Sequence, residues 1–455
     1  MARTRCRSDR LHPAAIGAPL SPRAATPIAG YLNGHAEAEA TQALQFEGAW
    51  SHAVCIPACN ENKSFGQTLD SIRIAADHST HDAESRRPLV ILVANGAEDA
   101  PSAFHQQNAA FLDWLHNGAQ TTPDHMVLGR WGDLDLLIVD RASAGRRLAA
   151  KQGVGLARKM AADIALALHN RGDIASPWIV CTDADVQVPP DTLDALPPAD
   201  APVSAALFPF EHQPEGTPTA QLAMLQYESF LHYQVLGLHW AGSPYAFHTV
   251  GSTIAFHAQR YAMVRGYPKR RAGEDFYLLN KLAKVAPVMP LDTAPFRIRG
   301  RPSDRVPFGT GAALRRIEEL HRVGAPYGVT HPQIFAGLRA WLKIIADFAQ
   351  APNTDRLEQW LQADTSLAPG VLHGALGDLG ALQAAVDAAQ QAPAGAQLHR
   401  RLLEWNDGFR TLKLNHAIRD RGLPPMPLAQ ALREAPFVPP WDTQEEHQHL
   451  HAIRE

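Results

Sequence analysis

Two carboxylates stand directly after a short apolar run, and this pattern strongly limits what the chain can fold into. The run spans Trp178 to Cys181, Asp183 and Asp185 follow it, and prolines occupy positions 189 and 190. Four apolar residues bounded in this way predict a short buried strand. In an open α/β sheet, ligands bind at the carboxyl ends of the strands, where paired carboxylates can hold a divalent ion that carries phosphates. The segment therefore predicts a site for a ligand such as a nucleotide sugar, with simple capping of the loop as the alternative.

A second Asp-x-Asp pair in the chain provides an internal comparison. Asp133 and Asp135 precede the apolar run 136–139, whereas Asp183 follows its run. The earlier pair is therefore expected at the start of a strand, at the opposite edge of the sheet. We interpret it as a solvated pair without a role in catalysis.

Apolar runs and helical stretches alternate between residues 53 and 181. Strands are predicted at 53–56, 89–94, 134–139 and 178–181, and helices at 64–76 and 153–168. This alternation is typical of a mostly parallel sheet with crossover helices. Amphipathic stretches such as 332–350 follow beyond residue 311 and predict an all-helical region. We therefore expect a disordered N-terminal tail at 1–45, where arginines and prolines abound, an α/β domain at 46–310 and a helical C-terminal region at 311–455.

Composition excludes several classes of protein. The 455 residues are 45% hydrophobic and 19% charged, which is ordinary for a soluble globular protein. The net charge of -4 argues against bulk binding of nucleic acid, because no basic excess exists to neutralise phosphates. The four cysteines have neither zinc-site nor disulfide-framework spacing, which fits a reducing compartment. No apolar stretch approaches the ~18 residues of a membrane helix, and the N-terminus lacks the apolar core of a signal peptide. We expect a cytoplasmic protein with no transmembrane segment, and peripheral association with a membrane stays open.

A later segment places carboxylates beside glycine for a second time. Gly251-Ser252 precedes an apolar run, which suggests a close approach of the backbone to a ligand. Gly273-Glu274-Asp275 precedes another apolar run, at residues 276–279. Acidic residues are also favoured in the first turn of a helix, so helix capping is a full alternative for Glu274 and Asp275.

The order of these segments is more distinctive than any one of them. Over roughly residues 50–310, the chain resembles the soluble, non-processive family-2 glycosyltransferases with a GT-A fold. The matching segments are Ile56 to Glu61 at the nucleotide-binding strand, Thr182 to Asp185 at the metal and diphosphate site, and Gly251-Ser252 with Ala272 to Asp275 on the acceptor side. The resemblance implies a Rossmann-like mixed sheet with flanking helices.

The resemblance also implies roles for individual residues. Asp275 would be the catalytic base, with Glu274 beside it, in an inverting transfer of a hexosyl group from a nucleoside diphosphate sugar. Asp185 and Asp183 would hold a divalent cation, Mn²⁺ or Mg²⁺, and the acceptor would be a hydroxyl-bearing glycan, lipid-linked or small molecule. The donor-side residues would be Pro57, Asn60, Glu61, Asn95, Arg158, Asp183, Asp185 and Arg305, and the acceptor-side residues Gly251, Ser252, Trp240 and Tyr245.

Two departures from the family pattern leave the nucleotide base and the acceptor open. Many relatives have Asp-Asp-Gly-Ser after the second strand, where this chain has Asn95-Gly96; an asparagine can pair with uracil or guanine. The Gln-x-x-Arg-Trp signature of processive enzymes is missing after Asp275, which argues against a polymerising synthase.

Other candidates have a structural explanation beside the functional one. The arginines of 297–311 could form a loop that closes over the diphosphate, or they could be surface residues; we single out Arg305. Trp240 and Tyr245 could stack on sugar or belong to a buried helix. His248 and His257 are candidates for a further metal ligand or for structural residues.

Two other functions compete with glycosyl transfer. A sugar nucleotidyltransferase has a related sheet and paired aspartates, but it usually carries a Gly-rich basic loop after the first strand, which residues 57–61 lack. A non-catalytic GT-A-like module would bind a sugar nucleotide or organise partners through its helical region. Fold alone does not identify the substrate.

Overall fold

The computed structural model describes residues 27–62, 64–79, 86–300 and 309–439. Its centre is an eight-stranded sheet with the order β10-β7-β9-β5-β1-β2-β4-β3. Strands β3 and β9 run antiparallel to their neighbours, and the other pairs are parallel. The strands are β1 (Ala53–Ala58), β2 (Leu89–Asn95), β3 (Met126–Trp131), β4 (Leu134–Arg141), β5 (Trp178–Cys181), β7 (Ala205–Leu207), β9 (Ile254–His257) and β10 (Val288–Pro290).

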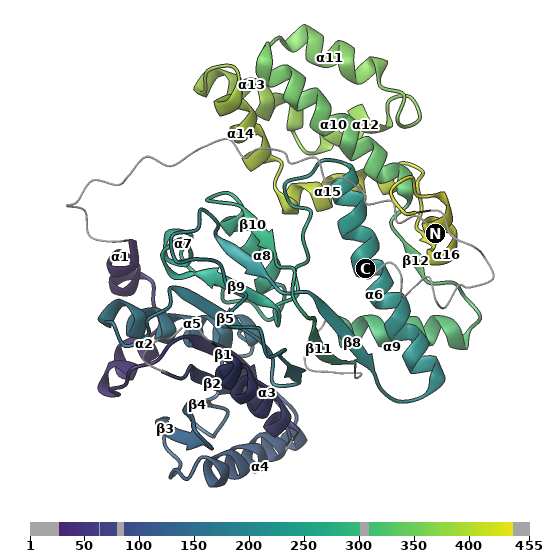
Figure 1. Cartoon of the computed structure of the whole chain (residues 1–455). Coiled ribbons are helices and arrows are strands. Elements are labelled where there is room, and N and C mark those ends of the chain that lie inside the picture. Colours follow the sequence, from purple (N-terminus) through teal and green to yellow (C-terminus); the bar gives the residue numbers. More distant parts are fainter. Residues whose placement is uncertain (1–26, 63, 80–85, 301–308, 440–455) are drawn as a thin grey trace, which may run out of the picture.

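Helices cover both faces of this sheet (Figure 1). Along β1, Ala53 and Cys55 face one apolar cluster and Val54 and Ile56 face the other, as the two-residue period of a strand requires. The first cluster includes residues of α1 (Pro27–Gly34), α5 (Val154–Arg171), α7 (Ala258–Met263) and α8 (Glu274–Leu282), and the second includes residues of α3 (Phe65–His78) and α4 (Ser102–Gly118). The two layers explain why β1 and β2 are buried along their whole length.

A small second sheet extends the carboxyl edge. It has the order β6-β11-β8, with β6 (Val186–Gln187), β8 (Phe210–Pro214) and β11 (Phe296–Gly300). Strand β6 begins directly after Asp185, and the backbone N–H of Arg299 in β11 donates to the Asp185 carbonyl over 3.2 Å. This pairing holds the second carboxylate of the Asp-x-Asp segment beside Arg299.

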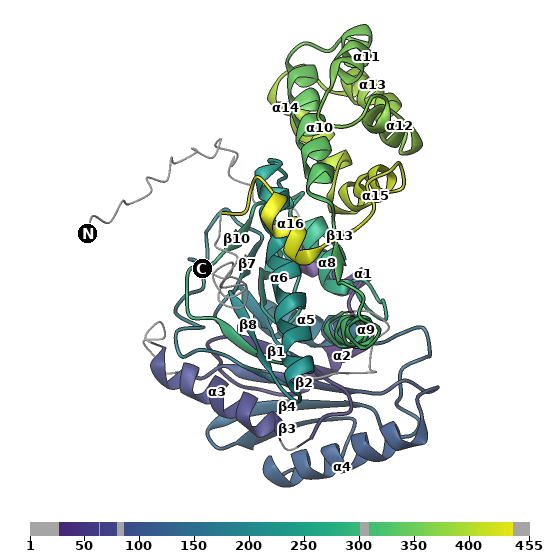
Figure 2. The same cartoon turned by 90° about the vertical axis from the view of Figure 1, so that its right-hand side faces the viewer.

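The described part of the C-terminal region is helical apart from one short two-stranded ladder. Long helix α6 (Pro218–Trp240) and α9 (Thr310–Arg322) connect it to the sheet domain. Helices α10 to α14 form a bundle at one end of the molecule in both views (Figures 1 and 2). The elements are β12 (Gly328–Val329), α10 (Pro332–Gln350), α11 (Thr354–Ala363), α12 (Val371–Asp378), α13 (Ala381–Gln391), α14 (Ala396–Trp405), α15 (Gly408–Arg419), β13 (Met426–Pro427) and α16 (Leu428–Glu434). The predicted fold class, a mixed α/β sheet with flanking helices followed by a helical C-terminal region, is confirmed.

The expectation of a disordered tail is wrong for residues 27–45, and residues 1–26 lie outside the described part of the chain. Residues 27–45 form α1, α2 (Ala38–Gln42) and a 3₁₀ turn, η1 (Ala43–Gln45). Tyr31, which is 2% exposed, donates from its hydroxyl to Asp163 Oδ1 over 2.6 Å. Lys159 donates to Asp163 Oδ2 over 2.7 Å. The segment is ordered because α5 offers it a buried polar partner, which its own composition does not reveal.

Candidate functional site

A cavity of about 820 Å³ opens at the carboxyl ends of β1, β2 and β5. This is where open α/β sheets bind their ligands. Ten of the predicted site residues line it: Pro57, Glu61, Asn95, Arg158, Asp183, Asp185, Gly251, Ser252, Glu274 and Asp275. Segments that are more than two hundred residues apart in the chain therefore meet at one site.

Asn60 does not line the cavity, although it was expected at the donor. Its backbone has a φ of 57°, in the left-handed region that asparagine tolerates better than most residues. Its N–H donates to Asn108 Oδ1 over 2.7 Å. Asn60 therefore makes the turn after β1, and the next residue, Glu61, lines the cavity.

Arg158 connects the two acidic segments. It projects from the first turns of α5, and only 4% of its side chain is exposed. Its Nε donates to Glu274 Oε1 over 2.9 Å, and its Nη2 donates to Asp183 Oδ1 over 2.6 Å. Burial alone would lower the pKa of Arg158, but the two carboxylates hold it well above its usual value. The guanidinium is thus a fixed positive charge between the Asp-x-Asp and the Gly-Glu-Asp segments.

Asp275 lies beside this ion pair, and its pKa is raised. Burial raises the pKa of Asp275 to about 7, and the charge of Glu274 acts in the same direction. The N–H of Phe276 donates to Asp275 Oδ1 over 2.7 Å and, together with Arg158, opposes the shift. A carboxylate with a pKa near neutrality can accept a proton during a reaction at physiological pH.

Gly251 leaves room for the side chains of Arg158 and Asp275. A Cβ at this position would lie 2.9 Å from Arg158 Nη2 and 3.2 Å from Asp275 Oδ2. The backbone can therefore pass beneath Asp275 and the Arg158 guanidinium only without a side chain.

The cavity lining also combines carboxylates with a second arginine. Asp185 and Glu61 line the cavity together with Arg299, whose Nη1 donates to Ser64 Oγ over 2.7 Å and whose Nε donates to Glu215 Oε1 over 2.7 Å. Hydrogen bonds from Arg299 to Glu215 raise the pKa of Arg299. Of the arginines predicted in this loop, Arg297 pairs with Glu211 at the surface, and Arg301 and Arg305 lie outside the described residues.

The structure places the two predicted acceptor-side aromatics elsewhere. Trp240 lies at the end of α6 under Arg339, with the guanidinium carbon 4.5 Å from its ring centroid, and beside Phe437. Tyr245 is buried, and its hydroxyl donates to the carbonyl of Leu403 over 3.4 Å. Neither lines the cavity, because both pack against the C-terminal region. This corrects the expectation that they form an acceptor cleft.

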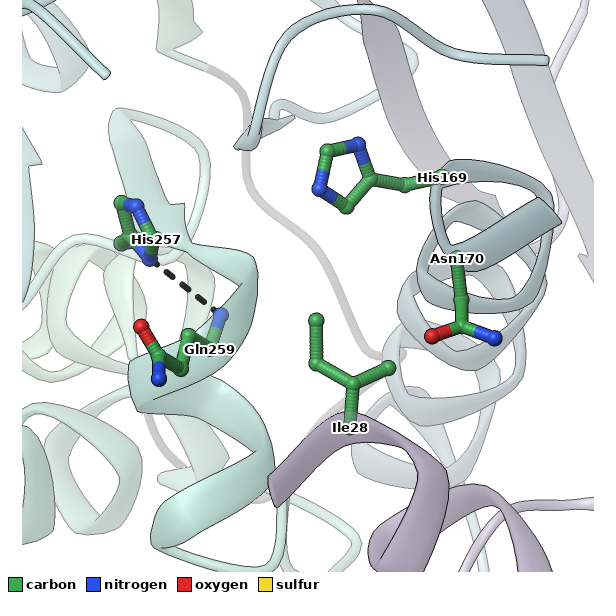
Figure 3. A pocket seen from close by; sticks show the side chains of 5 residues that line it. All are labelled: Ile28, His169, Asn170, His257 and Gln259. Carbon is green, nitrogen blue, oxygen red and sulfur yellow. Dashed lines mark hydrogen bonds between the residues drawn. The ribbon is translucent and has the colours of Figure 1, made fainter. Parts of the chain in front are cut away.

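The two histidines considered as metal ligands also lie outside the cavity. His257 lines a different, smaller pocket with His169, and its Nδ1 accepts from the Gln259 N–H over 3.2 Å (Figure 3). His248 packs against Phe210 and His232, and burial lowers its pKa to about 3. Within the part of the chain that the structure describes, no cluster of three or more His, Cys, Asp or Glu side chains is arranged to hold a metal ion.

Several cavity residues were not predicted to be functional. Sequence reasoning missed His212, Arg270, Arg271, Phe276, Tyr277, Phe409 and Leu412. Arg270 and Arg271 stand next to the Gly-Glu-Asp segment, so their proximity could have identified them. Phe409 and Leu412 lie over 130 residues further along, and no local pattern connects them to the site.

Comparisons with known proteins do not assign a family. No protein-family model matches the chain, and no curated protein matches it. The solved structures that match include S. aureus TarS 1-349 in complex with UDP-GlcNAc, with a TM-score of 0.36 and 13% sequence identity, covering 79% of this chain and 91% of that one. A likeness of this degree establishes no activity. Among the described residues, no helix is long and apolar enough to cross a bilayer.

Proposed function

We propose that this chain is a glycosyltransferase of the family-2, GT-A type that transfers a hexosyl group from a nucleoside diphosphate sugar to an acceptor hydroxyl with inversion. The observation that carries the proposal is one cavity that brings together a candidate base and a group of charged residues. Asp275, with a pKa near 7, lines the same cavity as Asp183, Asp185 and Arg299. Transfer of a sugar from an activated donor to a hydroxyl needs a base for the hydroxyl proton and charged groups that stabilise the leaving diphosphate.

The base is Asp275 and not Glu274. Glu274 was predicted beside it as a catalytic residue, but its carboxylate accepts the hydrogen bond from Arg158 Nε and is 5% exposed. Asp275 accepts the proton of the acceptor hydroxyl as that oxygen attacks the anomeric carbon. The bond between the anomeric carbon and the diphosphate oxygen breaks, and its electron pair leaves with the nucleoside diphosphate. Attack from the opposite face inverts the configuration.

The leaving diphosphate requires positive charge on the donor side. Arg299 lines the cavity and supplies one positive charge near this group, while its donors are held by Glu215 and Ser64. Asp185, with Asp183, is a suitable ligand pair for Mg²⁺ or Mn²⁺, because such an ion binds through one or two carboxylates and takes its other ligands from water and substrate phosphates. When bound, the ion would stabilise the charge that develops on the leaving group. Pro57, Glu61 and Asn95 would then surround the nucleoside.

Thermal stability in the presence of nucleotides tests the proposal. We would measure the melting temperature with UDP, GDP, dTDP and CDP, each with and without Mn²⁺, for the wild type and for Asp185→Ala. A ligand that binds only the folded state at a hundred times its Kd stabilises it by about 2.7 kcal/mol. We expect one nucleotide to raise the melting temperature in a manner that needs both Mn²⁺ and Asp185.

Asp133→Ala is the matched control, because Asp133 belongs to the second Asp-x-Asp pair and contacts Arg87 instead of the cavity. This variant should keep the full nucleotide shift. If no nucleotide stabilises the wild type with or without the metal, the transferase proposal fails. A shift without any transfer to a broad acceptor panel would favour the non-catalytic binding module.

A further inference from the structure

Helix α15 of the C-terminal region is fastened to α8, the helix that begins at Glu274 and Asp275. Asn280 Nδ2 donates to Asp407 Oδ2 over 3.1 Å, and the Gly408 N–H donates to Asn280 Oδ1 over 2.8 Å. Lys284 also donates to Asp407 Oδ2. Although burial opposes it, hydrogen bonds from Lys284, Arg410 and Asn280 lower the pKa of Asp407. The start of α15 therefore has a fixed position relative to the proposed base.

This attachment places an apolar wall at the cavity. Phe409 and Leu412 of α15 line the cavity together with Tyr277 of α8. The rings of Tyr277 and Phe409 are 6.0 Å apart at an angle of 43°. Leu412 is 43% exposed, although large apolar side chains on this protein are mostly covered. Aromatic and aliphatic groups on one cavity wall suit the apolar face of a sugar ring or an attached apolar group.

Positive charge lies next to the same wall. Arg270 and Arg271 are exposed and line the cavity, and the Arg270 guanidinium carbon is 4.0 Å from the Tyr277 ring centroid. The Gly155 N–H donates to the Arg270 carbonyl over 3.1 Å, which fixes the backbone of the pair. Lys413 Nζ lies 4.8 Å from the Phe409 ring centroid and adds a third cation.

These two arginines differ from the other cavity arginines in their ion pairing. Arg158 is bound by two carboxylates and Arg299 by Glu215. Neither Arg270 nor Arg271 forms an ion pair with any residue that the structure describes. Two guanidinium groups that pair with no carboxylate of the described residues, beside an aromatic wall, are suited to a ligand that is both anionic and partly apolar.

We propose that the space bounded by Tyr277, Phe409, Leu412, Arg270 and Arg271 is the acceptor subsite, and that it takes an anionic carbohydrate. The sugar ring, or an apolar group attached to it, packs on Tyr277 and Phe409, and a phosphate or carboxylate binds Arg270 and Arg271. This places the attacking hydroxyl on the Asp275 side of the cavity. The assignment as an acceptor subsite rests on the proposed transferase function, whereas the preference for an anionic ligand rests on the wall alone.

Matched ligands that differ only in charge test this preference. We would measure binding by titration calorimetry and saturation-transfer NMR, with and without UDP. The first pair is 4-nitrophenyl β-D-glucuronide against 4-nitrophenyl β-D-glucoside, and the second is glucose 6-phosphate against glucose. We expect the anionic member of at least one pair to bind at least about tenfold more tightly, and the two pairs separate carboxylate from phosphate recognition.

Three variants test whether this cavity wall causes the tighter binding of the anionic ligand. Arg270→Gln with Arg271→Gln should remove the advantage of the anionic ligand, and Phe409→Ala should weaken the charged and neutral members of the aryl pair alike. Arg130→Gln is the control for loss of an arginine charge outside the cavity, because Arg130 is 70% exposed on β3 at the far edge of the sheet. It should leave all affinities unchanged.

Two results would overturn the proposal. One is equal binding of the charged and neutral members in both pairs. The other is a double arginine variant that loses the nucleotide stabilisation seen in the wild type while keeping its preference for anionic ligands, because the arginines would then belong to the donor. Failure of the transferase proposal is distinguishable, since no nucleotide would then stabilise the protein although an anionic ligand could still bind here.

Discussion

Arg158 and Glu274 stand 116 residues apart in the chain and form a buried ion pair, with Arg158 Nε 2.9 Å from Glu274 Oε1. The same guanidinium donates to Asp183. One side chain thus fixes the distance between the proposed donor carboxylates and the segment that carries Asp275. We infer that Glu274 positions Arg158. The proposed roles of Glu274, Arg158 and Asp183 therefore depend on one another.

Removal of Arg158 should therefore destabilise the fold strongly. Arg158→Met leaves Glu274 and Asp183 without their buried partner, and the loss of one member of a buried ion pair typically costs about 3–5 kcal/mol. Arg158→Met combined with Glu274→Met should recover part of this loss, because the double variant leaves fewer uncompensated charges. Urea unfolding followed by circular dichroism measures both. A loss below about 1 kcal/mol for Arg158→Met would contradict the structural role.

Replacement of Asp275 should abolish transfer and spare nucleotide binding. Asn has the shape of Asp but does not accept the proton of the acceptor hydroxyl, and general base catalysis contributes typically about 10²–10⁴-fold to a rate. Asp275→Asn should therefore lose at least that factor in kcat while the nucleotide-dependent shift in melting temperature is retained. Product formation on any accepted substrate and thermal shift measure the two effects. Full activity in this variant would exclude Asp275 as the base.

The pH dependence of the wild type should reflect the same residue. The pKa of Asp275 is raised to about 7, mainly by burial. Only the deprotonated carboxylate acts as a base, so kcat/KM should fall about tenfold per pH unit below pH 7 and level off above it. Initial rates between pH 5 and 9 provide the profile. A profile that stays flat down to pH 5 would require a different base.

The raised pKa of Asp275 also predicts that the stability of the folded protein decreases with pH over a defined range. Between the usual pKa of an aspartate and about 7, the folded protein keeps the Asp275 proton while the unfolded chain releases it. The folded state then binds more protons, so this residue's contribution to stability falls as pH rises across that window and is constant above it. Asp275→Asn should therefore melt at a higher temperature than the wild type at pH 8, and the difference should shrink toward pH 4. The opposite trend would mean that the carboxylate is stabilised as the anion.

The sequence predicted where site residues lie when their position follows from the neighbouring residues. It failed for residues whose position depends on packing against distant parts of the chain. Asp183 and Asp185 follow an apolar strand, and that pattern places them at the carboxyl edge in any parallel sheet. Trp240 is a residue type that stacks on sugars, but Arg339 of α10 and Phe437 pack against it. Phe409 reaches the cavity only because Asp407 binds α8. Contacts of this kind depend on tertiary structure that no short segment encodes.

The Gly251 position offers the most local test of the site geometry. Gly251→Ala places a methyl group 2.9 Å from Arg158 Nη2 and 3.2 Å from Asp275 Oδ2, so one of the two must move. Overpacking of this kind typically costs about 1–3 kcal/mol of stability. A displaced base should also lower kcat about ten- to hundredfold, because misplacement of about 1 Å can cost 10²-fold. Gly377→Ala, in α12, is the control: a Cβ there meets no atom within 4 Å, so activity should be unchanged and stability equal or higher. Steady-state kinetics and urea unfolding of both variants measure these effects. Equal kcat in Gly251→Ala and the wild type would show that Asp275 is not held against this backbone during catalysis.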